Sequence, residues 1–330
     1  MKEEDIRPEK LLKKGKFYLK EDIKYLIKNK NKFVKVACPA CKKNNYKRFL
    51  NKNSFNYVIC KSCETFYMSP RPSEDLLKKF YKNSKNGKFW HKYMFPLTEK
   101  KRAQKIFKPR VEQIINLAKK QKLKKPNIID IGAGFGTFCN EAKKSKFFNN
   151  IFALEPSDAG AKSCQKRKIK TLHMPVESMK KQKFKFNLIT SFEVIEHLYS
   201  IDSYIKSIKK ICDKDTLLII TCPNGKGFDV QYLLKDSMTI DHEHLNYFNT
   251  ESIKIAFKRL GLKVIDIFTP GKLDLDLVVN FYKNQKLKTT GNSFFDDLIF
   301  SNNELKKNNF QKFLIQNNLS SNMWVVAKVK

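Results

Sequence analysis

The amino-acid sequence predicts an α/β fold, a doubly wound and mostly parallel sheet preceded by a small four-cysteine module. From residue 126 onward, short β-branched runs such as "NIIDI" and "TLLIITCPN" alternate with helical segments. Alternation at these lengths is typical of a parallel sheet whose strands are joined by crossover helices. Before that region, "CPAC" and "CKSC" interrupt short strands and turns. The 330 residues, 41% of them hydrophobic, are enough to build both parts.

We expect four regions along the chain. Residues 1–33 form an amphipathic helical lead-in that is interrupted near Gly15. Residues 34–72 form the four-cysteine module, 73–125 a helical connector, and 126–330 the sheet domain. The connector begins with "SEDLLKKFY", in which a serine precedes two acids and an apolar run, and this order is a helix N-terminus signal.

The charge of the chain, formally +35, would ordinarily suggest a nucleic-acid partner. Only seven of the 67 basic residues are arginine, however, and proteins that read bases favour the guanidinium fork. We therefore expect a solvated lysine surface. The apolar stretches are too short to span a bilayer, and "MKEEDIRPEK" lacks the apolar segment of a secretory signal, so we expect no membrane insertion and a cytoplasmic location.

The cysteine pattern predicts a zinc site. Cys38 and Cys41 form one CxxC pair, Cys60 and Cys63 form another, and the eighteen residues between the pairs have the length of a β-hairpin. This is the ligand spacing of a four-cysteine zinc site. Four thiolates leave no open coordination position, so a bound Zn²⁺ would be structural. A redox dithiol needs only one CxxC pair, and iron–sulfur spacings are usually tighter.

The glycines of "NIIDIGAGFGTF" exclude two familiar phosphate-binding turns. After Gly132 and Gly134, a dinucleotide fingerprint needs a third glycine at 137, where threonine stands, and the glycine comes one residue early at Gly136. A Walker loop is excluded because no "GK[ST]" closes the turn. Glycines at these positions still let a ligand approach the backbone closely.

The segment Asp130-x-Gly132-x-Gly134-x-Gly136 resembles the first motif of class I S-adenosylmethionine (SAM)-dependent methyltransferases. The resemblance implies a Rossmann-like methyltransferase sheet with an antiparallel last strand, and SAM as the cofactor. It also implies that Asp130 holds the amino end of SAM and that the turn, including Ala133, passes along the ligand. Glu155 ends the second predicted strand, where the family's acid binds both ribose hydroxyls, and Pro156 would lie beside the adenine.

Two later segments extend the resemblance. In "HMPVESM", the loop after the third strand, Val176 and Glu177 correspond to the family's adenine contacts. In "FNLITSFEVIEHL", Ser191, Phe192 and Glu193 lie at the carboxyl end of the fourth strand, the edge at which ligands bind in open α/β sheets.

The segment "DHEHLNYF" supplies the candidate chemistry. It resembles the "HEHL-x-Y" segment of sugar C-methyltransferases, which also carry a four-cysteine zinc module before a class I domain. That resemblance makes His244 the general base and Glu243 its orienting partner. Related zinc-ribbon methyltransferases of surface-polysaccharide synthesis share "SPRPS" and "EHLNYF", and for them we expect O-methylation. Histidines that only bond the backbone are the structural alternative.

A second constellation, Glu193, Glu196 and His197, resembles the magnesium-binding segment of quinone-biosynthesis O-methyltransferases. We favour a Glu193 close to SAM and a packed His197, because magnesium takes few protein ligands.

The sequence therefore predicts a SAM-dependent methyltransferase acting on a carbohydrate, either free or nucleotide-linked, with Arg102 or Arg110 available to a diphosphate. The rival is an rRNA or tRNA methyltransferase that binds RNA through the ribbon and the basic surface. A non-catalytic scaffold is a third alternative, against which the intact Asp130, glycine turn and Glu155 argue.

Overall fold

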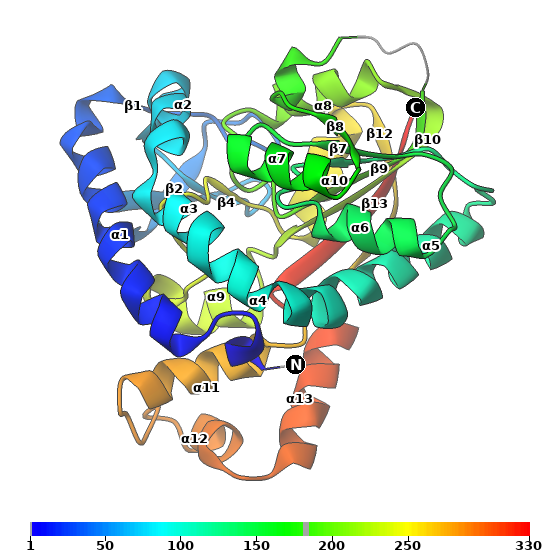
Figure 1. The fold of residues 1–330 in the computed structure, drawn as a ribbon. Coiled ribbons are helices and arrows are strands. Elements are labelled where there is room, and N and C mark those ends of the chain that lie inside the picture. Colours follow the sequence, from blue (N-terminus) through cyan, green and yellow to red (C-terminus); the bar gives the residue numbers. More distant parts are fainter. Residues whose placement is uncertain (1, 181–184) are drawn as a thin grey trace.

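The computed structural model describes residues 2–180 and 185–330, so residue 1 of the lead-in and residues 181–184 of the sheet domain lie outside the described part. A seven-stranded sheet runs through the centre of the molecule (Figure 1) in the order β12-β13-β10-β9-β6-β7-β8. Its strands are β6 (Ile128–Ile131), β7 (Ile151–Leu154), β8 (Lys170–Leu172), β9 (Phe186–Phe192), β10 (Cys212–Pro223), β12 (Leu262–Phe268) and β13 (Asn322–Val329).

The sheet is parallel except at β13, the last strand in the chain, which pairs antiparallel with both β10 and β12. The order reverses between β6 and β9, so their carboxyl ends form the edge at which a ligand binds in an open α/β sheet. The predicted fold class, including the antiparallel last strand, is confirmed.

Helices cover both faces of the sheet, which explains the nearly continuous apolar runs of its strands. One face packs against α5 (Lys108–Lys120), α6 (Thr137–Lys144) and α7 (Asp158–Lys166). The other packs against α8 (Ile201–Lys209) and α10 (Thr250–Arg259). Neighbouring residues of a strand divide between the faces: Ile128 packs on the first and Ile129 on the second.

The cysteine module is a second, antiparallel sheet in the order β11-β4-β3-β2. The predicted hairpin between the two CxxC pairs is present as β2 (Tyr46–Lys52) and β3 (Phe55–Cys60), followed by β4 (Phe66–Met68). Its fourth strand, β11 (Asn246–Tyr247), comes from the "DHEHLNYF" segment, far away in sequence. A short pair, β1 (Phe33–Val34) with β5 (Arg71–Pro72), closes the module.

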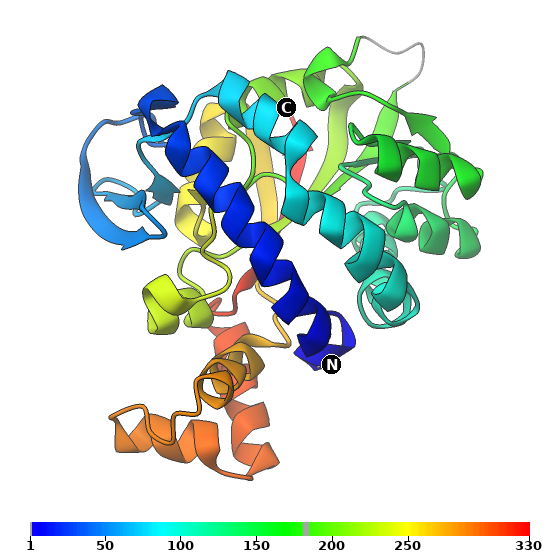
Figure 2. The same cartoon turned by 60° about the vertical axis from the view of Figure 1, so that its left-hand side comes forward.

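The lead-in forms one helix, α1 (Glu9–Lys28), between the short 3₁₀ turns η1 (Glu3–Asp5) and η2 (Lys30–Lys32). The interruption expected at Gly15 is wrong. Gly15 is buried, and a Cβ there would lie 3.2 Å from the ring of Phe89, so this glycine lets the helix pack closely instead of breaking it. In Figure 2, α1 crosses the front of the molecule.

The connector is a nearly continuous helical path. It contains α2 (Glu74–Asn83), α3 (Lys85–Phe89), a π-helical turn η3 (Trp90–Met94), α4 (Phe95–Arg102), a second π-helical turn η4 (Ala103–Phe107), and then α5. Ser73 caps α2 by accepting a hydrogen bond from the Leu76 amide, as predicted. π-helical turns occur frequently at functional sites.

Between β12 and β13 the chain leaves the sheet and forms three helices: α11 (Asp274–Asn284), α12 (Ser293–Phe300) and α13 (Glu304–Gln316). They pack with α9 (Phe228–Leu233) around their own apolar cluster below the sheet (Figure 1). The remaining 3₁₀ turns are η5 (Val176–Ser178) and η6 (Leu234–Asp236).

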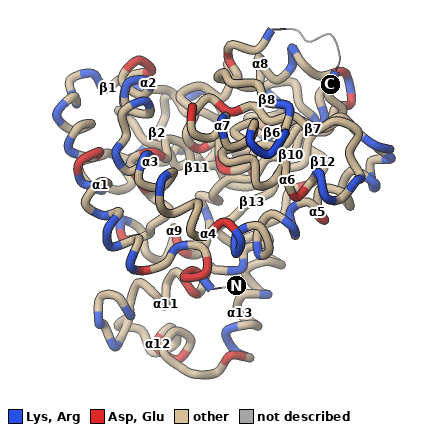
Figure 3. Tube along the Cα trace, in the orientation of Figure 1, with Lys and Arg blue, Asp and Glu red and all other residues tan. Residues whose placement is uncertain are grey.

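Lys and Arg occur along most of the Cα trace, with Asp and Glu between them (Figure 3). Within residues 2–180 and 185–330, no helix combines the length and the apolar character that crossing a membrane requires.

Candidate active site

The glycine turn after β6 is tightly packed and left-handed. Gly132, Gly134 and Gly136 have φ angles of 77°, 55° and 71°. A Cβ at Gly132 would lie 2.6 Å from a methyl carbon of Val194, and one at Gly136 would lie 2.8 Å from the Cys164 sulfur. Packing against protein side chains therefore excludes a Cβ at these two positions, whereas a Cβ at Gly134 would meet nothing within 4 Å.

The acid at the end of β7 is held against this turn. Glu155 accepts hydrogen bonds from the amides of Gly134 at 2.8 Å and Ser157 at 2.8 Å, and its side chain is buried. Gly160 makes this contact possible, because a Cβ there would lie 2.6 Å from the Glu155 Cγ. Gly160 was not among the predicted site residues. A glycine in the first turn of the helix that follows Glu155 is the sequence feature that could have identified it.

Asp130 lies beneath the turn at the end of β6. Its carboxylate accepts a hydrogen bond from the Thr190 hydroxyl at 2.8 Å, and burial raises its pKa to about 7. The carbonyl oxygen of Ala133, one residue into the turn, accepts a hydrogen bond from the Gly136 amide. The structure thus brings Asp130, the glycines and Glu155 together.

The other predicted cofactor residues divide into two groups. Pro156 and Glu193 line the same cavity as Glu155. Val176 is buried in the core, and Glu177 is exposed on η5, so neither lines that cavity. Ser191 is buried, accepting a hydrogen bond from Tyr204 and donating one to the Ile131 carbonyl.

Glu193 is the most heavily bonded acid of the site. It has a positive φ of 55°, and one carboxylate oxygen accepts hydrogen bonds from Thr221 at 2.6 Å, Asn322 at 3.0 Å and Arg110 at 3.4 Å. The Arg110 guanidinium also lies 4.8 Å from the Phe192 ring centre. Thr221 and Asn322 come from β10 and β13, and nothing in their local sequence marks them.

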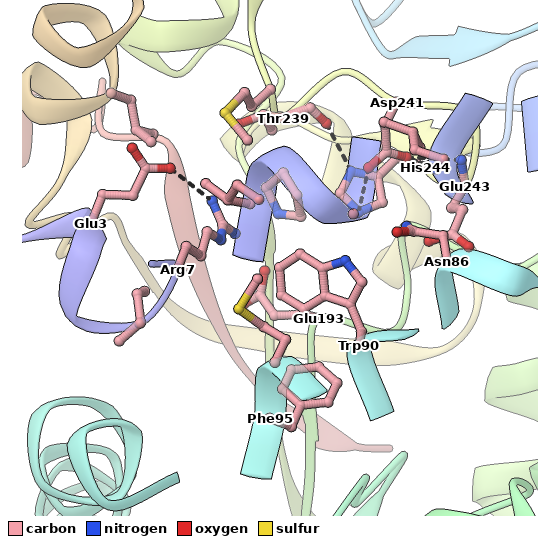
Figure 4. A pocket seen from close by; sticks show the side chains of 18 of the residues that line it. Glu3, Arg7, Asn86, Trp90, Phe95, Glu193, Thr239, Asp241, Glu243 and His244 are labelled. Atoms are coloured by element: carbon pink, nitrogen blue, oxygen red, sulfur yellow. Dashed lines mark hydrogen bonds and ion pairs between the residues drawn. The ribbon is translucent and has the colours of Figure 1, made fainter. Parts of the chain in front are cut away.

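Glu155, Pro156, Glu193 and Arg110 line a cavity of about 2280 Å³ (Figure 4), whereas Asp130 and the glycines at 132, 134 and 136 are not part of its lining. Glu155, Pro156 and Glu193 lie on its cofactor side, while the opposite walls come from α1, the π turns, α11 and the loop 239–249. Three arginines line it: Arg7, Arg102 and Arg110. Burial, together with the positive charges of Arg7 and Arg110, lowers the pKa of Arg102 to about 10. The sequence analysis missed Arg7, which comes from the lead-in.

The loop 239–249 presents the predicted catalytic pair to this cavity. The His244 Nδ1 lies 2.8 Å from the Thr239 carbonyl oxygen, and Asp241 accepts hydrogen bonds from the amides of Glu243 and His244. The ring of His244 is thus oriented by Thr239, whereas the resemblance assigned that role to Glu243. Burial and the nearby Asp241 raise the pKa of the Glu243 carboxyl to about 8.

A second histidine lies against this loop. The His197 Nδ1 is 3.1 Å from the Glu243 carbonyl oxygen, and the rings of His197 and His244 lie 4.6 Å apart. Burial lowers the pKa of His197 to about 3 and raises that of Glu196 well above its ordinary value.

The four-cysteine module fixes the loop in place. Strand β11 of the loop pairs with β4, and the Tyr57 hydroxyl donates to the Asp241 carbonyl at 2.6 Å. The buried Arg71 donates to the carbonyls of Met68, Tyr199 and Leu245. One surface of this module therefore supports the loop 239–249.

The sulfurs of Cys38, Cys41, Cys60 and Cys63 lie within 4.8 Å of one another, with Cys38–Cys63 and Cys41–Cys60 separations of 3.5 Å. Thiolates that bind Zn²⁺ at about 2.3 Å in a tetrahedron are about 3.8 Å apart, so the four residues fit such an ion.

A sheet of this order, with a glycine turn after its first parallel strand and a buried acid after the second, defines a class I SAM-dependent methyltransferase. Consistent with this, a family model described as a methyltransferase domain matches residues 99–267, and the chain belongs to that family.

No curated protein matches the chain. Among solved structures, a SAM-dependent methyltransferase from Thermotoga maritima is similar at 13% identity and a TM-score of 0.46, covering 73% of this chain and 98% of its own. Magnesium protoporphyrin IX methyltransferase from Synechocystis PCC 6803, solved with S-adenosylhomocysteine (SAH), is similar at 9% identity and a TM-score of 0.45, covering 71% and 87%.

Proposed function

We propose that this enzyme transfers the methyl group of SAM to a hydroxyl of a carbohydrate, a sugar or nucleotide-linked sugar used in surface-polysaccharide synthesis. The observation that carries the proposal is the single cavity shared by Glu155, Pro156 and the loop 239–249. A cavity walled by long helices suits a small acceptor. We favour O-methylation over C-methylation because the "SPRPS" and "EHLNYF" segments resemble the polysaccharide-associated enzymes.

SAM would occupy the side of the cavity next to the glycine turn. Asp130 would attract its amino group, and Glu155 would accept hydrogen bonds from both ribose hydroxyls in place of the two backbone amides that it now holds. Pro156 would lie beside the adenine. We retain Val176 and Glu177 as candidates for the far edge of the adenine.

Methyl transfer is an in-line displacement at carbon. The acceptor oxygen forms the new bond to the methyl carbon, the carbon–sulfur bond breaks, and its electron pair stays on sulfur as SAH forms. A sugar hydroxyl is a weak nucleophile and must lose its proton. His244 is positioned to activate it: a carbonyl can only accept, so the Thr239 carbonyl fixes the proton on Nδ1 and leaves a lone pair on Nε2.

The arginines support an acceptor that carries phosphate. Arg110 is paired with Glu193, whereas Arg102 contacts only the face of Phe95 among the described interactions. Buried guanidinium groups favour bidentate binding of phosphate oxygens. Arg102, with Arg7 beside it, would therefore bind the diphosphate of a nucleotide-linked sugar.

The four-cysteine module would hold a structural Zn²⁺. Because β11 is part of its sheet, the metal would stabilise the catalytic loop rather than take part in the reaction. Only seven of the 67 basic residues are arginine, which favours a small acceptor over RNA.

Incubation with methyl-labelled SAM and a panel of nucleotide sugars, free sugars and total RNA tests the proposal. We expect the label to appear in a nucleotide sugar. Hydrolysis of that product should release an O-methylated sugar that carries the label. Labelled RNA, with no transfer to any sugar, would replace this proposal with the RNA alternative. Failure to bind SAM in calorimetry would indicate a non-catalytic scaffold.

A further inference from the structure

Three side chains beside the cavity bring potential metal ligands together. One ligand atom each from Glu196, His197 and His244 lie within 4.8 Å of one another. Glu196 is completely buried, and neither of its carboxylate oxygens has a hydrogen-bond partner among the described residues. A buried, unpartnered carboxylate is costly unless a proton or a cation compensates it.

The tautomers of the two histidines leave a free lone pair on each ring. The Nδ1 of each ring lies against a backbone carbonyl, that of Glu243 for His197 and that of Thr239 for His244. Carbonyl oxygens only accept, so each Nδ1 carries the proton and each Nε2 bears a lone pair. Apart from these two N–H groups, which face carbonyls, the cluster offers only acceptors: the two Nε2 lone pairs and the Glu196 carboxylate. The His244 Nε2 also lies 3.9 Å from a carboxylate oxygen of Asp241.

This arrangement matches how proteins prepare metal ligands. Ligating histidines usually donate their other ring N–H to a carbonyl or carboxylate, which fixes the ring. Two histidines and one glutamate are a ligand set of catalytic zinc sites, in which a further coordination position stays open. Here both histidines line the cavity while Glu196 lies behind them, so the open position would face the acceptor.

We propose that Glu196, His197 and His244 bind a divalent ion of the zinc type, separate from the ion of the four-cysteine module, which coordinates the acceptor hydroxyl. Glu193 is not a member of this cluster, and one of its carboxylate oxygens instead accepts hydrogen bonds from Arg110, Thr221 and Asn322. The set thus differs from the Glu193–Glu196–His197 triplet that the sequence suggested, by exchanging Glu193 for a histidine of a distant loop.

The ion would supply Lewis-acid activation. Coordination would lower the pKa of a bound hydroxyl. With His244 acting as a ligand, the Glu243 carboxylate on the same wall, instead of the His244 Nε2, would take the hydroxyl proton as the oxygen bonds to the methyl carbon and the carbon–sulfur electron pair leaves with SAH. This role rests on the proposed function, whereas metal binding itself does not.

Metal analysis of the full chain, purified without a histidine tag and equilibrated with Zn²⁺, tests the site. We expect two zinc ions per wild-type chain and one in Glu196→Gln, whose second-site affinity should fall about 100-fold or more, since even a residue that only supports a metal ligand is worth roughly 10–100-fold. His173→Ala, which removes an exposed histidine, is the matched control and should keep two.

Cobalt substitution identifies the sites separately. Co²⁺ bound by four thiolates gives strong sulfur charge-transfer bands, whereas Co²⁺ bound by nitrogen and oxygen gives only weaker visible bands. We expect both spectra in the wild type and the thiolate spectrum alone in Glu196→Gln. Since the amide of this variant can donate to a histidine Nε2, its metal-free form should fold as well as the wild type, which circular dichroism verifies.

One zinc ion per wild-type chain, or two in Glu196→Gln, would overturn the inference. In the first case Glu196 would carry a proton instead of neighbouring a metal. These results are distinguishable from a failure of the proposed function. A chain that binds two ions but methylates no sugar would support the metal site and contradict the proposed acceptor. A chain that binds one ion and methylates a sugar would support the acceptor and contradict the metal site.

Discussion

The two sides of the cavity are built in different ways. On the cofactor side, backbone turns at the ends of adjacent strands make the surface, and Glu155 is fixed by amides only two and twenty-one residues away. On the acceptor side, side chains from the lead-in, the connector and the loop 239–249 meet across long stretches of chain. The cofactor side is thus a property of the sheet, while the acceptor side depends on how separate elements assemble. Changes on one side should leave binding on the other largely intact.

The largest expected effect is on the acceptor side. His244→Ala should lower kcat by about 10²–10⁴-fold, the usual contribution of a group that activates a nucleophile, while the Kd for SAM stays unchanged. Turnover at saturating SAM and calorimetry measure the two quantities, with His173→Ala as the control. Unchanged turnover would remove His244 from the chemistry.

The reciprocal change is Glu155→Gln on the cofactor side. Because two charge-assisted hydrogen bonds to the ribose would be weakened, we expect the Kd for SAM to rise about 100-fold. The KM for the acceptor should hardly change. Glu112→Gln is the matched control, since Glu112 is exposed on α5 and outside the cavity, and it should bind SAM normally. An equal loss in both variants would show that the effect is not specific to Glu155.

A smaller effect should separate acceptors from one another. Arg102→Gln should raise the KM for a nucleotide-linked sugar by about tenfold, the value of one charge-assisted hydrogen bond, without changing SAM affinity. An uncharged sugar should show no difference. Arg48→Gln, which alters an exposed arginine of the cysteine module, serves as the control in the same steady-state assay. A tenfold loss for the uncharged sugar as well would show that Arg102 does not recognise phosphate.

The mildest test uses pH. Burial raises the pKa of Asp130 to about 7, so its carboxyl becomes anionic only as the pH passes that value. SAM affinity should therefore increase about tenfold between pH 6 and pH 8, as the anion that attracts the SAM amino group forms. Without SAM, the same shift makes stability fall as pH rises from about 4 to 7, because the native state keeps a proton that the unfolded chain has lost.

Asp130→Asn isolates this contribution. Its SAM affinity should be low and independent of pH over this range, and its metal-free, cofactor-free form should lose less stability between pH 4 and pH 7 than the wild type does. Calorimetry and urea unfolding at each pH provide the measurements. A pH dependence that survives in Asp130→Asn would assign it to another group.

The same contrast explains what could be predicted from the sequence. The glycine turn, Asp130 and Glu155 follow consecutive strands, and parallel strands bring their carboxyl ends to one edge, so local motifs were enough to group them. The cysteine spacing was equally local. By contrast, Arg7 reaches the cavity only because α1 packs along the connector, and Gly15, which permits that packing, looked like a helix breaker.

The residues of the acceptor side could not be grouped from the sequence, for a related reason. The sequence placed His197 with Glu193, its neighbour in a helical pattern, whereas Glu193 has a positive φ and points to Arg110, Thr221 and Asn322. His197 instead meets His244, forty-seven residues later. Periodicity reports which residues share a face of one element, and it carries no information about a loop that arrives from another part of the chain.

The strand shared between the cysteine module and the loop has a consequence for how the enzyme matures. Because β11 completes its pairing only when β4 is in place, the order of the loop is thermodynamically linked to the folding of the module, and through it to metal supply. In zinc-poor conditions, a newly made chain would form the cofactor side of the cavity first. Its acceptor side would become ordered only after zinc is bound. Zinc availability would then set the fraction of chains that are competent to turn over, independently of the concentration of SAM.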